Sequence, residues 1–437
     1  MPKKKQHFVR SSNLNFDQVN CAKLDLLRVF LCEYRSALTQ FVDYYWFKHN
    51  LDGNWTRLDI QTRGSYYPYP TALVVSDSIL SARALKAAAT QAMGMINAAL
   101  RKKQKQMWQL ARMQHDGADP SSYKKLHQKI STVPLVKPTI NRQVGAELNS
   151  INAQLDQHQG SFDLCLTLSA LFSNQYKKEN LEGQSKIHLP LKQHRRFNHW
   201  HSRSIEVMKS FLITERQVSV RFKCKRPEKP ATGVRAACDQ GMRSLLSVVY
   251  TTGQRHASES CPDGHDMDSI VRDMNNKKRG SKNYRKKQAQ RTNYINWCAN
   301  QLDLDSVDEF VLEKLVNMGY KRRTSSYLRR FTHAQIRSKL QALCEEKGVL
   351  FREQSSEYRS QRCSSCGWVH SKNRSAKKFK CQSCGHEDDA DFNAAANHLV
   401  ALVQLQRNLV RGKNKTTGFY WNPVGRGTCS SSRKPKQ

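Results

Sequence analysis

Four cysteines in the C-terminal part of the sequence are spaced as two CxxC pairs, Cys363 with Cys366 and Cys381 with Cys384. Four thiolates at this spacing can surround one ion as a tetrahedron, which is the geometry of structural zinc sites. The spacing therefore predicts one structural zinc ion. Whether this ribbon also contacts nucleic acid stays open, because the basic residues between the pairs fit either a nucleic-acid contact or a solvated loop: Lys372, Arg374, Lys377, Lys378 and Lys380.

Three acidic residues could hold a second kind of metal. Asp239 and Glu313 each end a short apolar run, and Asp391 follows the second cysteine pair at what looks like the first turn of a helix. Carboxylates of this kind can hold two magnesium ions about 3.5–4 Å apart, which is the arrangement that cleaves phosphodiester bonds. We therefore expect Asp239, Glu313 and Asp391 to be catalytic magnesium ligands.

Each acid alone has a simpler interpretation. Glu313 next to Lys314 could be half of a surface ion pair, and Asp391 could be a helix-capping acid. The three acids in this order, with a cysteine quartet between the last two, form a far more specific pattern than any one of them.

The charge balance indicates a polyanionic partner. The 437 residues include 73 Lys and Arg against 36 Asp and Glu, a formal net charge of +37. No apolar run is long enough to span a membrane and no secretory signal begins the sequence, so we expect no membrane partner. Nine cysteines outside the quartet, scattered singly, are typical of a reducing compartment. We expect a cytoplasmic, nucleoid-associated protein in a prokaryote and a nuclear one in a eukaryote.

The apolar pattern changes along the chain and predicts an α/β multidomain protein. Helical spacing dominates about 16–130, and period-two alternation dominates about 160–225. A linker rich in proline follows, at 227–233. Beyond it we expect three strands, a helix, a strand, a helix, a strand, the cysteine insert and a last helix, an order that resembles a ribonuclease-H-like fold.

The motifs as a set, over about 233–408, resemble the RuvC nuclease domain of the transposon-encoded TnpB proteins and the compact type V CRISPR effectors. The matching motifs are Asp239-Gln-Gly241-Met-Arg-Ser-Leu-Leu, Val311-Leu-Glu313-Lys-Leu and Asp389-Ala-Asp391-Phe-Asn393-Ala-Ala. The cysteine quartet lies where that family carries its zinc-binding target-nucleic-acid domain. One departure is Ala390, where the family often has arginine.

The resemblance implies a domain plan. It places an N-terminal helical recognition block and a strand-rich, oligonucleotide-binding-like wedge barrel in 1–230. It places the first part of the RuvC domain in 233–360, the zinc ribbon in 361–387 and the last RuvC helix in 388–410. We expect a basic, loosely held tail at 411–437.

The resemblance also implies the function and the partners. In that family a guide RNA pairs with target DNA, and the protein reads a short flanking DNA motif. We therefore expect an RNA-guided DNA endonuclease that acts as a monomer or a homodimer on one RNA. The expected backbone contacts are Lys277, Lys278, Arg279, Lys282 and Arg285 in one basic run, and Arg195 and Arg196 in a stretch that mixes basic, histidine and aromatic residues at 192–201. A solvated strand end with a buried Trp200 is an equal alternative for that stretch.

Three other functions compete with this one. A DDE-type transposase shares the fold and the three acids, although the sequence shows no clear helix-turn-helix for transposon ends. A nuclease-inactive RNA-guided repressor would not need the intact acids. A plain zinc-ribbon transcription factor leaves those acids unexplained.

Overall fold

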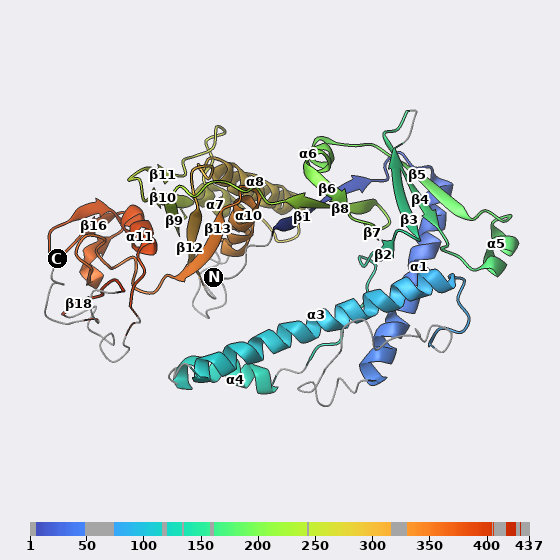
Figure 1. The fold of residues 1–437 in the computed structure, drawn as a ribbon, viewed down its shortest axis with the longest axis horizontal. Helices are drawn as coiled ribbons and strands as arrows, with labels where there is room; N and C mark the ends of the chain where they lie inside the picture. The colour runs from blue at the N-terminus through green and yellow to red at the C-terminus, as the bar shows by residue number, and fades with distance from the viewer. Residues whose placement is uncertain are drawn as a thin grey trace. The chain divides into compact units, whose positions relative to one another are not determined.

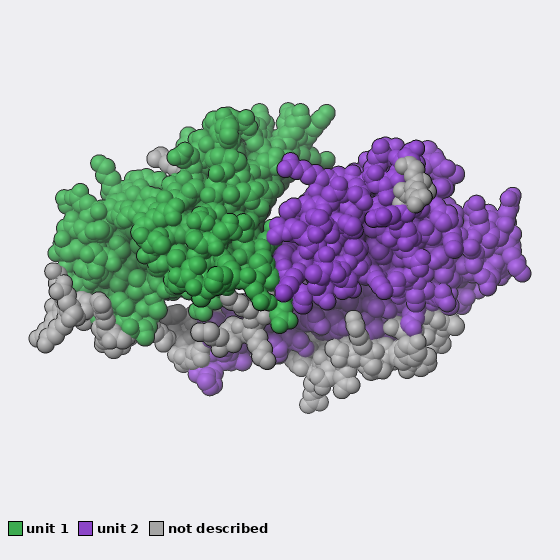
Figure 2. Space-filling model, turned by 45° about the horizontal axis from the view of Figure 1, so that its top comes forward, with its two compact units in different colours: residues 1–6, 226–437 green, residues 7–225 purple. Residues whose placement is uncertain are grey.

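The structure is a computed structural model, and it describes residues 6–48, 74–115, 120–132, 135–157, 161–242, 244–315, 330–403, 405, 417–424 and 429. The chain divides into two compact units, residues 7–225 and residues 1–6 with 226–437 (Figure 2). Within the described ranges, no helix combines the length and the apolar character needed to cross a membrane. The two units are described separately below.

The unit 7–225 contains two antiparallel sheets (Figure 1). One has the order β1-β8-β7-β2, with β6 also paired to β8, and its strands are His7–Asn15, Gln217–Lys225, Ser210–Ile213, Ala146–Asn149 and Ser204–Val207. The other joins β3 (Ala153–Gln157), β4 (Leu164–Ser169) and β5 (Lys186–Leu191). In the described ranges no strand pairing joins the two sheets, and the expected barrel stays a prediction.

Long helices cover much of the core of this unit. Helix α1 (Cys21–Lys48) packs against α3 (Ala82–His115), and α4 (Pro120–Thr132) follows α3. Leu27, Leu31 and Leu38 on α1 are fully buried at helical spacing, while a run of small alanines on α3 lets the two helices approach. The Tyr34 hydroxyl donates to Gln91 Oε1 at 3.0 Å, which fixes their register. The short helix α5 (Asn174–Asn180) precedes β5.

The mixed basic and aromatic stretch is a helix and not a strand end. Helix α6 (Arg195–Arg203) begins at the capping residue His194, whose ring accepts from the Phe197 N–H. Phe197 and Trp200 are buried in the core, and Arg195 and Arg196 are exposed. Trp200 is therefore not available to stack on bases, whereas both arginines are placed where a phosphate could reach them.

The other unit is built on a five-stranded mixed sheet of order β11-β10-β9-β12-β13. Strands β9 (Arg235–Gln240), β10 (Leu246–Tyr250) and β11 (Arg255–Ala257) are antiparallel neighbours. Strands β12 (Glu309–Lys314) and β13 (Leu350–Ser355) continue the sheet in parallel with β9. The central strands β9, β10 and β12 are almost entirely buried, which indicates that both faces of the sheet are covered.

Different helices cover the two faces of this sheet. Helices α7 (Met267–Asn275), α8 (Lys282–Asn300) and α10 (His333–Glu346) share one apolar core with Cys238, Leu246 and Leu312 of the sheet. Helix α11 (Ala390–Leu399) packs on β9, β10 and β12. Since successive residues of a strand point to opposite faces, the neighbours of Cys238 and Leu312 face away from that apolar core.

A small ribbon precedes α11. Its strands are β14 (Trp368–Val369), β15 (Arg374–Ser375), β16 (Lys378–Lys380) and β17 (Glu387–Asp389), with the short helix η2 (Ser371–Asn373) between the first two. Strands β15, β16 and β17 form one antiparallel sheet, and β17 runs directly into α11. The position of α11 is thus tied to the ribbon by the covalent chain.

Part of the C-terminal tail is firmly packed, which corrects the expectation of a loosely held tail for residues 417–424. Strand β18 (Phe419–Tyr420) pairs with β14, and Phe419 and Trp421 are buried against Val369. The Trp421 indole N–H donates to the Val403 carbonyl at 2.8 Å. The basic composition concealed this short apolar strand. Residues 411–416, 425–428 and 430–437 lie outside the described residues.

Candidate active site

Two of the predicted acids lie side by side at one edge of the sheet. In the parallel pair β9–β12, Leu312 is opposite Cys238, and Glu313 and Asp239 are the next residues of their strands. Both acids therefore project from the face opposite the apolar core, towards α11. Asp239 and Glu313 are 9% and 6% exposed, so Glu313 is no surface ion-pair partner of Lys314.

The third acid, Asp391, lies in the first turn of α11 and is also buried. It is not the helix cap: Asp389 Oδ1 accepts from the Asp391 and Phe392 N–H groups and fills that role. Arg374 Nη2 lies 2.8 Å from Asp391 Oδ1, and Lys377 Nζ pairs with Asp391 Oδ2. Two of the basic residues between the cysteine pairs thus bind a buried member of the acid cluster, which consists of Asp239, Glu313 and Asp391. Their sequence positions did not indicate this role.

His398 is the residue of this site that sequence reasoning missed. One ring nitrogen of His398 and one carboxylate oxygen each of Asp239 and Glu313 all lie within 4.8 Å of one another. His398 is seven residues after Asp391, which places both on one face of α11 two turns apart, and helical side chains lean towards the N-terminus. The only available signal was this i, i+7 spacing.

The electrostatics of the cluster favour protonated acids in the absence of a cation. The pKa of Glu313 is raised to about 7, mainly by burial and also by the charge of Asp391, while the Gln240 N–H and Arg374 lower it. Burial also raises the pKa of Asp239 well above its usual value, helped by Glu313 and Asp391. Burial lowers the pKa of His398 to about 3, with a further contribution from Arg359. A divalent cation would reverse the cost of ionising both carboxyl groups.

Neighbouring backbone holds the acids in place. The Gln240 N–H donates to Glu313 Oε1 at 2.7 Å. At Gly241, a Cβ atom would lie 2.7 Å from the Ser244 carbonyl oxygen and 3.7 Å from Asp391 Oδ2. A side chain at this position would collide with the Ser244 carbonyl, so glycine lets the chain turn tightly beside the acids.

The four cysteines converge in the ribbon. Cys363 Sγ is 3.8 Å from Cys384 Sγ, and Cys366 Sγ is 3.6 Å from Cys381 Sγ. A tetrahedron with zinc–sulfur bonds of about 2.3 Å has sulfur–sulfur edges of about 3.8 Å, whereas a disulfide needs about 2.05 Å. The quartet therefore has the dimensions of a metal site.

Ala390, the departure from the family motif, is fully buried against Phe379 and two of the cysteines. A small residue at this position lets the start of α11 pack directly on the ribbon. The basic residue Lys380 pairs with Glu387 on the neighbouring strand, at 2.6 Å.

The predicted nucleic-acid contacts are all exposed. Lys277, Lys278 and Arg279 occupy the turn between α7 and α8, and Lys282 and Arg285 lie on the first turns of α8. Lys287, further along α8, pairs with Asp273 at 2.7 Å. Exposure is what a phosphate contact requires, and it does not by itself show one.

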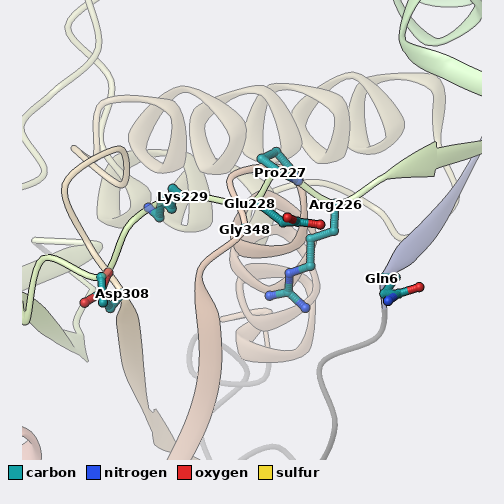
Figure 3. Close-up of a pocket in the computed structure, with 8 residues that line it drawn as sticks. Gln6, Arg226, Pro227, Glu228, Lys229, Asp308 and Gly348 are labelled. Carbon is teal, nitrogen blue, oxygen red and sulfur yellow. The ribbon is translucent and has the colours of Figure 1, made fainter.

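A separate pocket of about 450 Å³ lies around the linker that leads into β9 (Figure 3). Its charged groups are already used by the protein: Arg226 donates to the Val349 carbonyl, Lys229 Nζ donates to the Leu304 carbonyl at 2.8 Å, and Asp308 accepts from the Gly233 N–H at 2.7 Å. This pocket is a joint between the linker and the sheet, and the acid cluster is the better candidate site.

Comparison with known proteins shows which family the C-terminal part of the chain is similar to. Residues 333–398, which include α10, the ribbon and α11 up to His398, match the family described as "Cas12f1-like, TNB domain". The sequence resemblance is thereby confirmed over this segment. The match joins the cysteine quartet and Asp391 in one family unit.

Two curated relatives align over short segments. The chain is 37% identical over 84 residues to the CRISPR-associated endodeoxyribonuclease Cas12f1 of Sulfoacidibacillus thermotolerans, 19% of each chain. It is 34% identical over 86 residues to a putative transposase of Paramecium bursaria Chlorella virus 1, 20% of each chain. The alignments thus span about a fifth of the length of these relatives.

A solved structure extends the likeness in fold. The chain superposes on a Cas12f1 chain from a cryo-EM structure of a Cas12f1–sgRNA–target DNA complex with a TM-score of 0.50 and 16% identity, over 87% of this chain and 82% of that one. At this identity the likeness shows the α/β multidomain fold alone.

Proposed function

We propose that this protein is an RNA-guided DNA endonuclease that cuts DNA at a RuvC-type site formed by Asp239, Glu313 and Asp391. The observation that carries the proposal is the convergence of these three buried acids from β9, β12 and α11, next to a segment that matches a Cas12f1-like domain. The order of the five strands and of α11 is the one that we expect of a ribonuclease-H-like nuclease domain.

The donor set fits a divalent cation. Buried carboxyl groups whose pKa values are raised by burial and by one another gain most from a nearby positive charge, and carboxylate oxygens are the ligands that magnesium prefers. Asp239 and Glu313 would hold the cation, and Asp391 would join them on exchange of its Arg374 or Lys377 contact. Two magnesium ions, when bound, activate water and stabilise the leaving oxygen of a phosphodiester.

The protein's own groups then position the DNA. Arg374 and Lys377 both pair with Asp391, so they lie where they can bind the negatively charged phosphate of the DNA at the site. Because the three acids are buried, bulk water has little access to the reacting site. The ribbon, with zinc bound by Cys363, Cys366, Cys381 and Cys384, fixes the loop that carries Arg374 and Lys377.

A guide RNA would supply target choice. The net charge of +37 favours a large polyanionic partner, and the exposed basic residues of α6 and of the α7–α8 turn suit backbone contacts, which carry no sequence information. We propose that guide pairing and a short flanking DNA motif together select the target, with one or two copies of the chain on one RNA, and that the strand-rich part of 7–225 forms the wedge barrel.

The test is cleavage of target DNA by the purified protein with its native guide RNA and magnesium. Asp239→Asn, Glu313→Gln and Asp391→Asn should each lower cleavage by at least 10³-fold, while guide-dependent DNA binding stays within about twofold, because pairing supplies the affinity. The matched control is Asp305→Asn, an acid of the same unit that pairs with Lys347 at the surface. Full cleavage by any one acid variant would remove that residue from the site.

A DDE-type transposase is the second candidate, because one relative carries the name of a putative transposase. The two functions differ in their need for RNA. Sequence-specific cutting by RNA-free protein would support the transposase, and retargeting of the cut by a changed guide supports the RNA-guided enzyme. Guided binding with no cutting by the wild-type protein would instead support the nuclease-inactive repressor.

A further inference from the structure

His398 lies within the acid cluster and not beside it. Its side chain is 1% exposed. One of its ring nitrogens, one carboxylate oxygen of Asp239 and one of Glu313 all lie within 4.8 Å of one another. Asp391 is not part of this tight group, and its two oxygens pair with Arg374 and Lys377. Apart from the cysteine quartet, the group of possible metal donors in the described residues is therefore two carboxylates and one imidazole.

The backbone on both sides of His398 is fixed. Arg359 donates to the carbonyl of Asn397, and Arg235 donates to that of Leu399 at 3.0 Å. The Asn397 side-chain amide donates to the Arg362 carbonyl at 2.7 Å. Arg235 begins β9, the strand that carries Asp239, so these contacts tie the end of α11 to the same strand as the acid.

One ring nitrogen of the imidazole has no hydrogen-bond partner among the described residues. His398 Nδ1 is buried and, among the described residues, makes no hydrogen bond. An unsatisfied buried polar atom is costly, and native proteins rarely keep one without a ligand, water or ion nearby. A core histidine would be expected to bond a backbone group, whereas three lone-pair donors that face a common space fit a cation.

We propose that His398 is a nitrogen ligand of the divalent metal held by Asp239 and Glu313, and that this site consequently prefers manganese over magnesium. The inference rests on the proposed function only in taking Asp239 and Glu313 as metal ligands. Magnesium favours oxygen donors and gains little from imidazole, whereas first-row transition ions bind imidazole well. The proposal assigns to His398 a role that the three-acid pattern does not contain.

The test is manganese binding to the full-length, zinc-loaded protein, followed by pulsed electron paramagnetic resonance. Bound Mn²⁺ should show ¹⁴N coupling from imidazole, replaced by ¹⁵N coupling when the histidines are ¹⁵N-labelled. His398→Leu, which keeps the core filled, should abolish the nitrogen coupling and weaken manganese binding by about 10- to 100-fold, with a smaller change for magnesium. His398→Gln is the second variant, for the case that the leucine variant does not fold.

The control is His256→Leu. His256, on β11, also has a buried ring nitrogen without a hydrogen bond, but it belongs to neither metal-ligand group of the described residues. This variant should keep both the coupling and the manganese affinity. Wild-type protein that binds manganese without nitrogen coupling, or folded His398 variants with unchanged affinity, would overturn the proposal.

The outcome for the acids separates the two proposals. If Asp239→Asn loses manganese and His398→Leu keeps it, the acid site stands and the histidine ligand fails. If Asp239→Asn binds manganese as the wild type does, the metal site of the proposed function fails, and the histidine inference fails with it.

Discussion

Arg374 Nη2 lies 2.8 Å from Asp391 Oδ1, and this ion pair joins the cysteine ribbon to the acid cluster. Arg374 belongs to β15, between the two cysteine pairs, and Asp391 opens α11. The Asp391 carboxylate is 5% exposed, so the pair is partly shielded from solvent. The ribbon therefore contributes side chains to the candidate active site as well as a metal site of its own.

This relationship predicts that the ribbon cations affect catalysis. Arg374→Ala and Lys377→Ala should each lower the cleavage rate by about 10- to 100-fold, since hydrogen bonds to charged groups contribute roughly 1.5–3 kcal/mol. The measurement is single-turnover cleavage at saturating guide and magnesium. Lys380→Ala is the control, because Lys380 pairs with the exposed Glu387 on the same ribbon. Equal losses in all three variants would indicate a general effect of ribbon charge instead.

The raised pKa of Glu313 predicts a pH-dependent stability of the metal-free cluster. An ordinary glutamate has a pKa of about 4.3, and that of folded Glu313 is about 7, so the native state holds the extra proton between these values. The free energy of unfolding should therefore fall as the pH rises from about 4.5 to 7, by up to ~3 kcal/mol from this group.

The measurement compares urea denaturation of the wild type and Glu313→Gln across this pH range, in magnesium-free buffer with zinc retained. The variant should lose the part of the slope that Glu313 contributes, because glutamine does not titrate, while the raised pKa of Asp239 keeps the remainder. Added magnesium should stabilise the wild type more at pH 8 than at pH 5, since the metal must displace the proton. Parallel pH curves for both proteins would contradict the buried, protonated glutamate.

The cysteine quartet should hold one zinc ion that stabilises the ribbon. Cys363→Ser should abolish stoichiometric zinc by elemental analysis and lower the thermal midpoint, because structural zinc contributes folding energy directly. Cys21→Ser, at an exposed cysteine outside the quartet, should change neither quantity. Purified wild-type protein with no zinc and four freely titratable thiols would exclude the site.

The proximity of Asp239 and Glu313 could be predicted from the sequence because each acid ends a short apolar run, which is a local pattern. A buried strand that ends in an acid is visible as an apolar run before Asp239 or Glu313, and parallel neighbours bring such ends to one edge. The contribution of His398 was not predictable in this way. It depends on how α11 lies across the sheet, and an imidazole in a helical pattern is equally typical of a satisfied core residue.

The misread segments have similar physical causes. The many charged residues of 192–201 concealed the helical spacing of its apolar residues. Phe197 and Trp200 are three residues apart and pack on one face of α6. In the tail, two residues of β18 are too short a run to register as a strand, and their stability comes from burial against Val369 of the ribbon. Tertiary packing decided both segments.

The exposed basic turn between α7 and α8 predicts a salt-dependent contact. Lys278→Ala should weaken guide-RNA or heteroduplex binding on all sequences alike and reduce the slope of log affinity against log salt by about 1. The measurement is a binding titration at several salt concentrations. Lys347→Ala removes the same charge at a lysine paired with Asp305, and its slope should stay unchanged. A sequence-dependent loss in Lys278→Ala would point to base recognition instead of a phosphate contact.

The packed part of the tail should stabilise the ribbon through Trp421. Its ring is buried, the Arg359 guanidinium lies 5.3 Å from the ring centre, and Arg362 Nε donates to its carbonyl at 2.9 Å. Trp421→Ala should therefore lower the free energy of unfolding by roughly 3–5 kcal/mol, the usual range for a buried tryptophan. Urea denaturation followed by zinc release would measure this loss at the ribbon itself. Val424→Ala, three residues on and 65% exposed, should change stability by less than about 0.5 kcal/mol. A Trp421 variant with wild-type zinc retention would show that the ribbon folds without the tail, and that β18 only rests on its surface.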